Sequence, residues 1–194
     1  EGVKIGRRYG VKFASRLTIG GEVVGFKLGG TTEATLARLD IDRPFHGPIF
    51  SSRMYETPAV LGRTDFIACI IEVEIGVRIG RDIGDGNGAP TRDDLIAAID
   101  GVFPAIEIAD SRLLNWSQAN AAAIIGDNGY AGAWIRGEDA PNWRHIDLVD
   151  LPITLRKDGE IIREGSGAVV LGDPLHALEM LISDLRQREQ ILRA

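Results

Sequence analysis

The clearest periodic pattern in the chain covers residues 66–79, where β-branched residues are frequent and hydrophobic and polar positions come to alternate. Alternation with a period of two predicts a strand, and it places Glu72 and Glu74 on the same face. A second apolar run covers residues 102–108 and contains one charged residue, Glu107. The pattern therefore predicts two strands in the middle of the chain, both of which carry acidic side chains.

Turn and cap residues divide the rest of the chain into short elements. No internal repeat or linker separates these elements, so we predict one α+β domain over residues 1–194, with an N-terminal helical segment over 1–20. The other predicted elements are a strand over 23–30, a helix over 33–39, a mostly loop segment over 42–58 with a brief strand near 49–50, a helix capped by Thr91 and ending at Ile99, a helix capped by Ser117 and ending at Ile125, a strand over 130–136, a hairpin that turns at 157–159, and a terminal helix over 174–192.

Composition narrows the classes of partner. The chain has 194 residues, a net charge of −6 and no cluster of basic residues, which argues against a nucleic-acid partner. No run approaches the roughly 18 apolar residues of a membrane span, so no membrane partner is expected. The single cysteine, Cys69, excludes an intrachain disulfide and favours a cytoplasmic location. A small molecule or another protein is the expected ligand.

The acidic residues of the two central strands are the strongest candidates for chemistry. Residues i and i+2 of a strand point the same way, about 7 Å apart, so Glu72 and Glu74 can converge on one cation with a third carboxylate from a neighbouring strand. Glu107 is costly to bury unless it is paired or binds a metal. Three carboxylates without His or Cys favour Mg²⁺, Mn²⁺ or Ca²⁺. The alternative is a solvated strand face, with Glu107 on an exposed edge strand.

Polar residues outside this group are weaker candidates. Lys27 lies in an apolar, glycine-bounded run, where it either offers a charge to an anionic substrate or simply points outward. Asp110 and Ser111 follow Glu107 closely and either support the site or end the strand. Asp127 and Asn128 lie in a turn, where they can donate or accept hydrogen bonds to a ligand or serve only as turn residues.

Five segments, taken in order, resemble one known family. They are Val24-Gly25-Phe26-Lys27-Leu28-Gly29, Ile71-Glu72-Val73-Glu74-Ile75, Pro104-Ala105-Ile106-Glu107-Ile108-Ala109-Asp110-Ser111-Arg112, Gly126-Asp127-Asn128 and Gly167-Ala168-Val169-Val170-Leu171-Gly172-Asp173-Pro174-Leu175. Together they resemble the 2-keto-4-pentenoate hydratase and 4-oxalocrotonate decarboxylase branch of the fumarylacetoacetase-like superfamily. The resemblance implies an α+β fold, a mixed β-sandwich roll with flanking helices, and assembly as a homo-oligomer.

The resemblance also implies an activity. Glu72, Glu74 and Glu107 correspond to the family's ligands for Mg²⁺ or Mn²⁺, and Lys27 corresponds to its active-site lysine. The implied enzyme is a metal-dependent hydratase that adds water to a 2-hydroxy-2,4-dienoate or 2-oxo-4-pentenoate type of acid in aromatic meta-cleavage catabolism. The alternatives are a decarboxylase or an acylpyruvate hydrolase of the same superfamily, and a pathway partner enzyme is compatible with each.

We assign further candidate roles beside this set. The candidate catalytic residues are Lys27, Asp110 and Ser111, and the candidate substrate-binding residues are Lys27, Asp127 and Asn128.

Two departures from the family pattern leave the reaction open. The family has an acidic residue just before a methionine, whereas Ser52 and Arg53 precede Met54 here. The family also continues with further strands after the segment that corresponds to the terminal helix, so the resemblance predicts a roll that lacks its last strands. These departures motivate the alternatives of a non-catalytic partner subunit and a solute-binding module.

Overall fold

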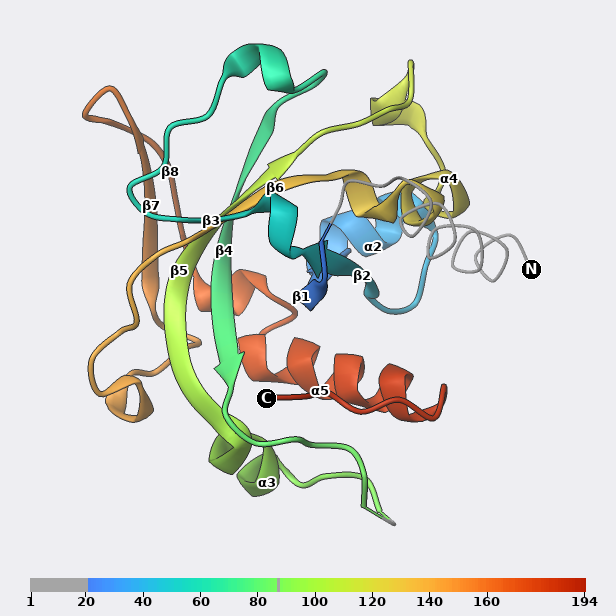
Figure 1. Cartoon of the computed structure of the whole chain (residues 1–194), viewed down its shortest axis with the longest axis vertical. Helices are drawn as coiled ribbons and strands as arrows, with labels where there is room; N and C mark the ends of the chain where they lie inside the picture. Colours follow the sequence, from blue (N-terminus) through green and yellow to red (C-terminus); the bar gives the residue numbers. More distant parts are fainter. Residues whose placement is uncertain (1–20, 87) are drawn as a thin grey trace. The chain divides into compact units, whose positions relative to one another are not determined.

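The computed structural model describes residues 21–86 and 88–194, and these form an α+β protein with mixed sheets (Figure 1). The helix expected within residues 1–20 lies outside the described residues. The main elements are β1 (Val23–Gly29), α2 (Glu33–Leu39), β2 (Phe45–Phe50), β3 (Met54–Glu56), β4 (Ile70–Ile79), α3 (Arg92–Ala98), β5 (Ile99–Ala109), α4 (Ala121–Gly126), β6 (Ala131–Arg136), β7 (Pro152–Lys157), β8 (Glu160–Ser166) and α5 (Pro174–Arg186).

Three sheets are present among the described residues. The largest has the strand order β3-β6-β5-β4, and it is mixed because β3 runs parallel to β6 while β5 runs antiparallel to β6. The pairs β1-β2 and β7-β8 form separate two-stranded antiparallel sheets. Because β5 has a strand on each side, Glu107 does not lie on an exposed edge. No described helix is long and apolar enough to cross a membrane.

The chain divides into two compact units. Among the described residues, the first contains 21–30, Ala34–Glu74 and Ala105–Glu138. Two apolar clusters stabilise it, and the smaller one places Phe66, Ile108 and Ala133 together beside the sheet. The larger cluster consists of Leu39, Phe45, Ala109, Ala121, Ile124, Ile125 and Tyr130. These clusters hold β2, β5, β6 and α4 in the arrangement on which the candidate site depends, and β1 is held by its antiparallel pairing with β2.

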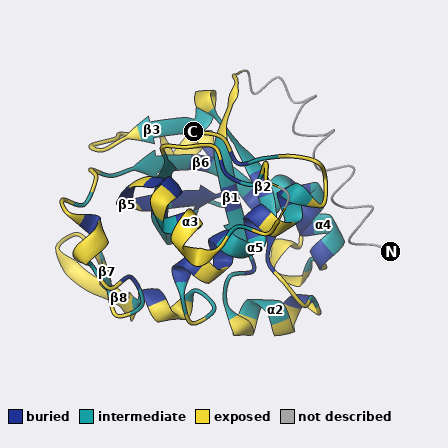
Figure 2. Ribbon diagram, turned by 90° about the horizontal axis from the view of Figure 1, so that it is seen from below, coloured by how far each residue is buried: buried dark blue, intermediate teal, exposed yellow. Residues whose placement is uncertain are grey.

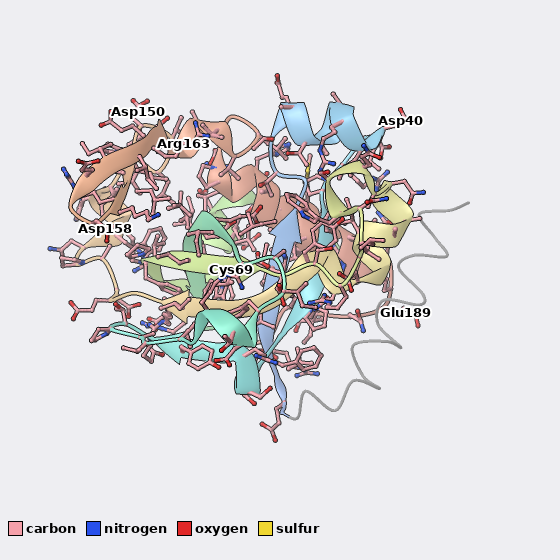
Figure 3. The ribbon with its side chains drawn as sticks, turned by 90° about the horizontal axis from the view of Figure 1, so that it is seen from above. Asp40, Cys69, Asp150, Asp158, Arg163 and Glu189 are labelled. Atoms are coloured by element: carbon pink, nitrogen blue, oxygen red, sulfur yellow. The ribbon has the colours of Figure 1, made fainter. Side chains whose placement is uncertain are left out.

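The second unit contains residues Thr31–Glu33, Ile75–Pro104 and Asp139–Ala194. Its terminal helix α5 buries the predicted stripe of Leu175, Leu178, Leu181, Ile182 and Leu185. The hairpin β7-β8 is largely exposed, as Figure 2 shows in yellow. Asp158, labelled in Figure 3, and Gly159 make its turn with φ angles of 52° and 85°, the left-handed conformation that a two-residue hairpin turn requires.

Several element boundaries differ from those predicted. The segment 42–58 is mostly strand rather than loop, because Pro48 lies in β2, an outer strand where a residue without an N–H group is tolerated. The strand predicted over 66–79 begins only at Ile70. The cap of α4 is Asn120 rather than Ser117, because the Asn120 side chain accepts a hydrogen bond from the Ala123 N–H. The terminal helix ends at Arg186 instead of 192.

Candidate metal and substrate site

Three carboxylate groups of the first compact unit lie close to one another. Glu72 and Glu74 lie two residues apart on β4, and Glu107 lies on the neighbouring strand β5. One oxygen atom from each of the three lies within 4.8 Å of the others. Glu72 is exposed, Glu74 is half-buried and Glu107 is buried, with 2% of its surface accessible. The expected convergence is confirmed, and the alternative of a solvated Glu107 is excluded.

Lys27 approaches the same group from β1. Its ammonium group forms an ion pair with the Glu107 carboxylate and donates a hydrogen bond to the Gly129 carbonyl oxygen at 2.7 Å. Only 8% of Lys27 is accessible, so the alternative of an outward-pointing lysine is wrong. Gly129 has a φ of 61°, and a Cβ there would lie 2.9 Å from Phe45 and 3.3 Å from the Lys27 nitrogen. A glycine is therefore needed where this carbonyl meets the lysine.

Burial, together with the neighbouring negative charges, alters the acidity of two members of the triad. The pKa of Glu74 is raised from its ordinary value of 4.5 to about 8, mainly because burial disfavours the charged carboxylate and secondly because Glu107 and Glu72 repel it. Burial also raises the pKa of Glu107, although Lys27 opposes this change. Without a cation, this cluster therefore tends to hold protons.

The donor set fits a hard divalent cation. Carboxylate oxygens are the ligands that Mg²⁺ and Ca²⁺ prefer, and the three-residue group contains neither His nor Cys. A cation at this position would also neutralise the repulsion that raises the pKa of Glu74. The residues that would hold it are Glu72, Glu74 and Glu107.

We expect the metal-free protein to become less stable as pH rises from about 4.5 to about 8. In this range the folded protein keeps a proton on Glu74 that the unfolded chain has lost, so the free energy of unfolding falls with pH. The slope is at most about 1.4 kcal/mol per pH unit for this one group. Urea denaturation in EDTA at several pH values measures it. A Glu74→Gln variant should show a flatter profile, and a wild-type stability that rises over this range would contradict the expectation.

Asp110 and Ser111 are both buried directly after β5. The Asp110 carboxylate accepts hydrogen bonds from the backbone N–H groups of Ala68 at 2.6 Å and Cys69 at 3.4 Å. Cys69, labelled in Figure 3, has a φ of 53°, so this bend ends the extended run immediately before β4. The Ser111 hydroxyl accepts a hydrogen bond from the Leu113 N–H at 3.0 Å. Asp110 thus fixes the segment that leads to Glu72.

Asp127 and Asn128 have different surroundings. The buried Asp127 carboxylate accepts hydrogen bonds from the Arg112 side chain at 2.8 Å and from the Arg112 backbone N–H at 3.2 Å. The Asn128 amide donates to the Pro48 carbonyl oxygen at 3.1 Å. A Cβ at Gly47 would lie 2.1 Å from the Asn128 side-chain oxygen, so Gly47 allows this close approach. Asn128 lines a cavity, whereas Asp127 orients Arg112.

A cavity of about 120 Å³ adjoins the ion pair. Lys27, Glu107, Asp110 and Asn128 contribute polar groups to its wall, and much of the remaining wall is apolar. The apolar part includes Pro48, Ile49, Phe50, Phe66, Ala131, Ala133 and Trp134. Such a cavity, largely apolar with a few convergent polar groups, is typical of a site for a small organic ligand.

The sequence analysis did not assign Arg53 and Asp65 to this site, although both line the cavity. The available signal for Arg53 was its place directly before Met54, where the family has an acid. No pattern in the sequence indicated Asp65, which lies in a short 3₁₀ turn, Arg63–Asp65, outside the motifs that carry the resemblance.

Comparison with known proteins places the sequence in one family. Residues 52–188 match the family described as fumarylacetoacetate (FAA) hydrolase C-terminal. A 2-keto-4-pentenoate hydratase of Paraburkholderia xenovorans is 30% identical over 179 residues, which cover 92% of this chain and 65% of that protein. A 4-oxalocrotonate decarboxylase of Pseudomonas putida is 32% identical over 177 residues, which cover 90% of this chain and 65% of that protein. The chain thus spans 65% of the length of these two relatives.

Solved structures agree with this placement. A 4-oxalocrotonate decarboxylase from Pseudomonas putida G7, complexed with magnesium and adipate, superposes with a TM-score of 0.88 at 30% identity and covers 97% of this chain and 71% of its own. The same enzyme complexed with calcium and acetate gives a TM-score of 0.82 over 94% of this chain and 68% of its own. Together with the family match, which extends over most of the sequence, these similarities show that the chain belongs to the fumarylacetoacetate hydrolase C-terminal family.

Proposed function

We propose that the protein is a divalent-metal-dependent lyase, a hydratase that adds water to a 2-hydroxy-2,4-dienoate or 2-oxo-4-pentenoate type of acid. The observation that carries the proposal is the convergence of three carboxylates and a buried lysine beside a largely apolar cavity. Relatives named 2-keto-4-pentenoate hydratase and 2-hydroxypent-2,4-dienoate hydratase support this reaction class. Mg²⁺ or Mn²⁺ is the proposed ion, and the magnesium complex of the related decarboxylase supports the first of these.

In this proposal Glu72, Glu74 and Glu107 hold the ion. Positive charge at this position stabilises the negative charge that develops on a 2-oxo acid when its α,β-unsaturated system gains or loses a proton. The protein must therefore bring the substrate oxygens to the triad and keep bulk water away from them. The apolar wall formed by Ile49, Phe50 and Phe66 is suited to excluding water around the carbon chain.

Lys27 holds a proton next to the reacting atoms. Its ammonium group makes two hydrogen bonds among the described residues, to Glu107 and to Gly129, which leaves one of its three N–H bonds for a substrate oxygen. A lysine in this position can bind the carboxylate of the acid or donate a proton. Since Lys27 also lines the cavity, it meets the substrate directly in this proposal.

The remaining candidate residues have different proposed roles, some in contact with the substrate and some through a neighbouring residue. Asp110 lines the cavity, and we retain it as a candidate for proton transfer because one carboxylate oxygen accepts both backbone hydrogen bonds and the other has no hydrogen bond to a described residue. Ser111 lies behind it and is proposed to orient this corner. Asn128 is proposed to donate or accept a hydrogen bond to the substrate, and Asp127 to act through Arg112.

A decarboxylase is the second candidate. The observation that favours it is the absence of an acid at positions 52 and 53, because hydration depends on a further proton transfer in which the family's acidic residue would take part. The similarity to a solved 4-oxalocrotonate decarboxylase supports the same candidate. A non-catalytic partner subunit would keep the metal but show neither activity.

The test measures turnover of 2-hydroxypenta-2,4-dienoate by its absorbance, and of 4-oxalocrotonate by release of CO₂, with Mg²⁺ and with EDTA. We expect activity only with the metal, and a loss of at least about 100-fold in a Glu74→Ala variant. Glu164→Ala, which alters an exposed carboxylate of β8, is the matched control and should retain activity. Turnover that ignores both EDTA and Glu74→Ala overturns the proposal. Bound Mg²⁺ without turnover of either acid favours the non-catalytic subunit.

The detailed fold, the location and the assembly of the protein are also part of the proposal. We propose a mixed β-sandwich roll formed as a single catalytic domain, a cytoplasmic location and assembly as a homo-oligomer. The family match over residues 52–188, which includes parts of both compact units, supports the single domain. Sedimentation of the purified protein tests the assembly.

A further inference from the structure

Three cationic side chains line the cavity, and two of them are paired with carboxylates of the protein. Lys27 is bound by Glu107 and Gly129. Arg112 donates to the Asp127 carboxylate at 2.8 Å, to the Ala131 carbonyl oxygen at 2.8 Å and to the Asp127 carbonyl oxygen. The third cation is Arg53, and its situation is different.

The Arg53 side chain forms no hydrogen bond or ion pair with any residue in the described part of the chain. It belongs to the short 3₁₀ turn Ser51–Arg53 and is half-buried. A guanidinium group carries five N–H donors in a planar fork that matches the two oxygens of a carboxylate. Because this fork lines the cavity without a partner among residues 21–86 and 88–194, it can meet an anionic group of a ligand there.

Strand register places Arg53 at some distance from the carboxylate triad. Met54 pairs with Trp134 on β6, and Trp134 pairs with Glu107 on β5, so these residues form one row across three strands. Two strand spacings separate the backbones of Met54 and Glu107 by about 10 Å. Arg53 directly precedes Met54. The cavity therefore has a positive group near β3 in addition to the group formed by Lys27 and Glu107.

The wall between these two groups is apolar. Ile49, Phe50 and Trp134 line the cavity and offer no charged partner to a ligand. Two carboxylates of the lining, Asp65 and Asp110, also form no ion pair among the described residues. The Asp65 carboxylate lies close to Gly62, within 2.8 Å of the position of a Cβ there, and the Asp110 carboxylate accepts the backbone N–H groups of Ala68 and Cys69. The cavity wall is thus charged near Lys27, apolar in the middle and charged again near Arg53. A ligand with an apolar carbon chain and an anionic group at each end matches this arrangement.

We propose that Arg53 binds the distal carboxylate of the substrate, so that the site selects a 2-oxo acid with a second carboxylate over the monocarboxylic acid of similar length. This inference rests on the proposed metal site, because it takes the first carboxylate to lie at the ion that the triad would hold. Of the two acids named for the activity test, it favours 4-oxalocrotonate, which has two carboxylates, over 2-hydroxypenta-2,4-dienoate, which has one. It assigns Arg53 as the residue that determines specificity at the far end of the cavity.

The test compares two probes of equal carbon number, adipate with two carboxylates and hexanoate with one. Isothermal titration calorimetry on the Mg²⁺-loaded full chain should show adipate binding at least about tenfold more tightly than hexanoate. Arg53→Met should weaken adipate binding by about tenfold to 100-fold and change hexanoate binding by less than about threefold. Arg53→Lys, which keeps the charge but not the fork, should retain part of the preference. Arg43→Met, which removes an exposed arginine that pairs with Asp42, is the matched control and should behave as wild type.

The outcomes separate this inference from the proposed function. If Mg²⁺ binds and both acids bind equally in wild type, or if Arg53→Met leaves the adipate preference unchanged, the role of Arg53 is overturned while the lyase proposal stands. If Mg²⁺ does not bind at the triad and neither acid binds, both proposals fail. Circular dichroism of each variant verifies folding, and the conservative Arg53→Lys variant decides the case if Arg53→Met does not fold.

Discussion

Replacement of Glu107 by glutamine is expected to abolish metal binding and turnover together. The change keeps the size of the side chain and an oxygen that can accept a hydrogen bond from Lys27, but it removes the charge of the most buried member of the triad. Loss of a residue that is hydrogen-bonded to a metal ligand lowers metal affinity by about 10- to 100-fold. Loss of a direct ligand should therefore lower it by at least about 100-fold. Calorimetric titration with Mg²⁺ and the absorbance assay measure the two losses.

The control for this variant is Glu164→Gln on the exposed strand β8, which changes the net charge equally. It should bind Mg²⁺ as wild type does. Circular dichroism of both variants establishes that the fold is intact. A Glu107→Gln protein that binds Mg²⁺ with wild-type affinity would show that the triad is not the metal site.

Replacement of Lys27 by methionine is expected to lower both stability and activity, while Mg²⁺ binding stays at least as tight. The variant leaves the Glu107 carboxylate buried without its ion pair, which costs about 3–5 kcal/mol in the free energy of unfolding. Because Glu107 can take up a proton at low pH, the loss should be larger at pH 8 than at pH 5. Activity should fall by about 10²- to 10⁴-fold if Lys27 transfers a proton. Metal affinity should not fall, since the lost charge repelled the cation.

Two further variants interpret the Lys27 result. Lys157→Met removes an exposed lysine of β7 and should have little effect on stability or activity. Lys27→Arg keeps a positive charge but does not release a proton near neutral pH, so retained activity would indicate an electrostatic role rather than proton transfer. A Lys27→Met protein with wild-type turnover would remove Lys27 from the proposed mechanism.

Much of the local structure followed from residues close together in the sequence. The stripe of apolar residues predicted the buried face of α5, and Thr91 with Asp94 forms the capping box that begins α3. The period of two predicted that Glu72 and Glu74 share one face. These predictions held because each depends on contacts within one turn of a helix or along one strand.

The boundaries that were wrong depend on distant partners. Cys69 leaves the extended run because the Asp110 carboxylate, 41 positions later, accepts its N–H group. Pro48 lies in a strand because β2 is an outer strand beside β1, which no local signal reveals. Local propensity cannot predict such cases, since the competing interactions come from elsewhere in the fold.

By itself, the sequence determined the class of fold, the identity of the candidate ligands and, through the order of its motifs, the family. Only the tertiary structure decided that Glu107 is buried, that Lys27 pairs with it, and that Arg53 enters the same cavity. The reason is physical. A carboxylate's burial and pKa depend on which strands lie beside it, and strand order results from the packing of the whole core rather than from the residues next to each charge.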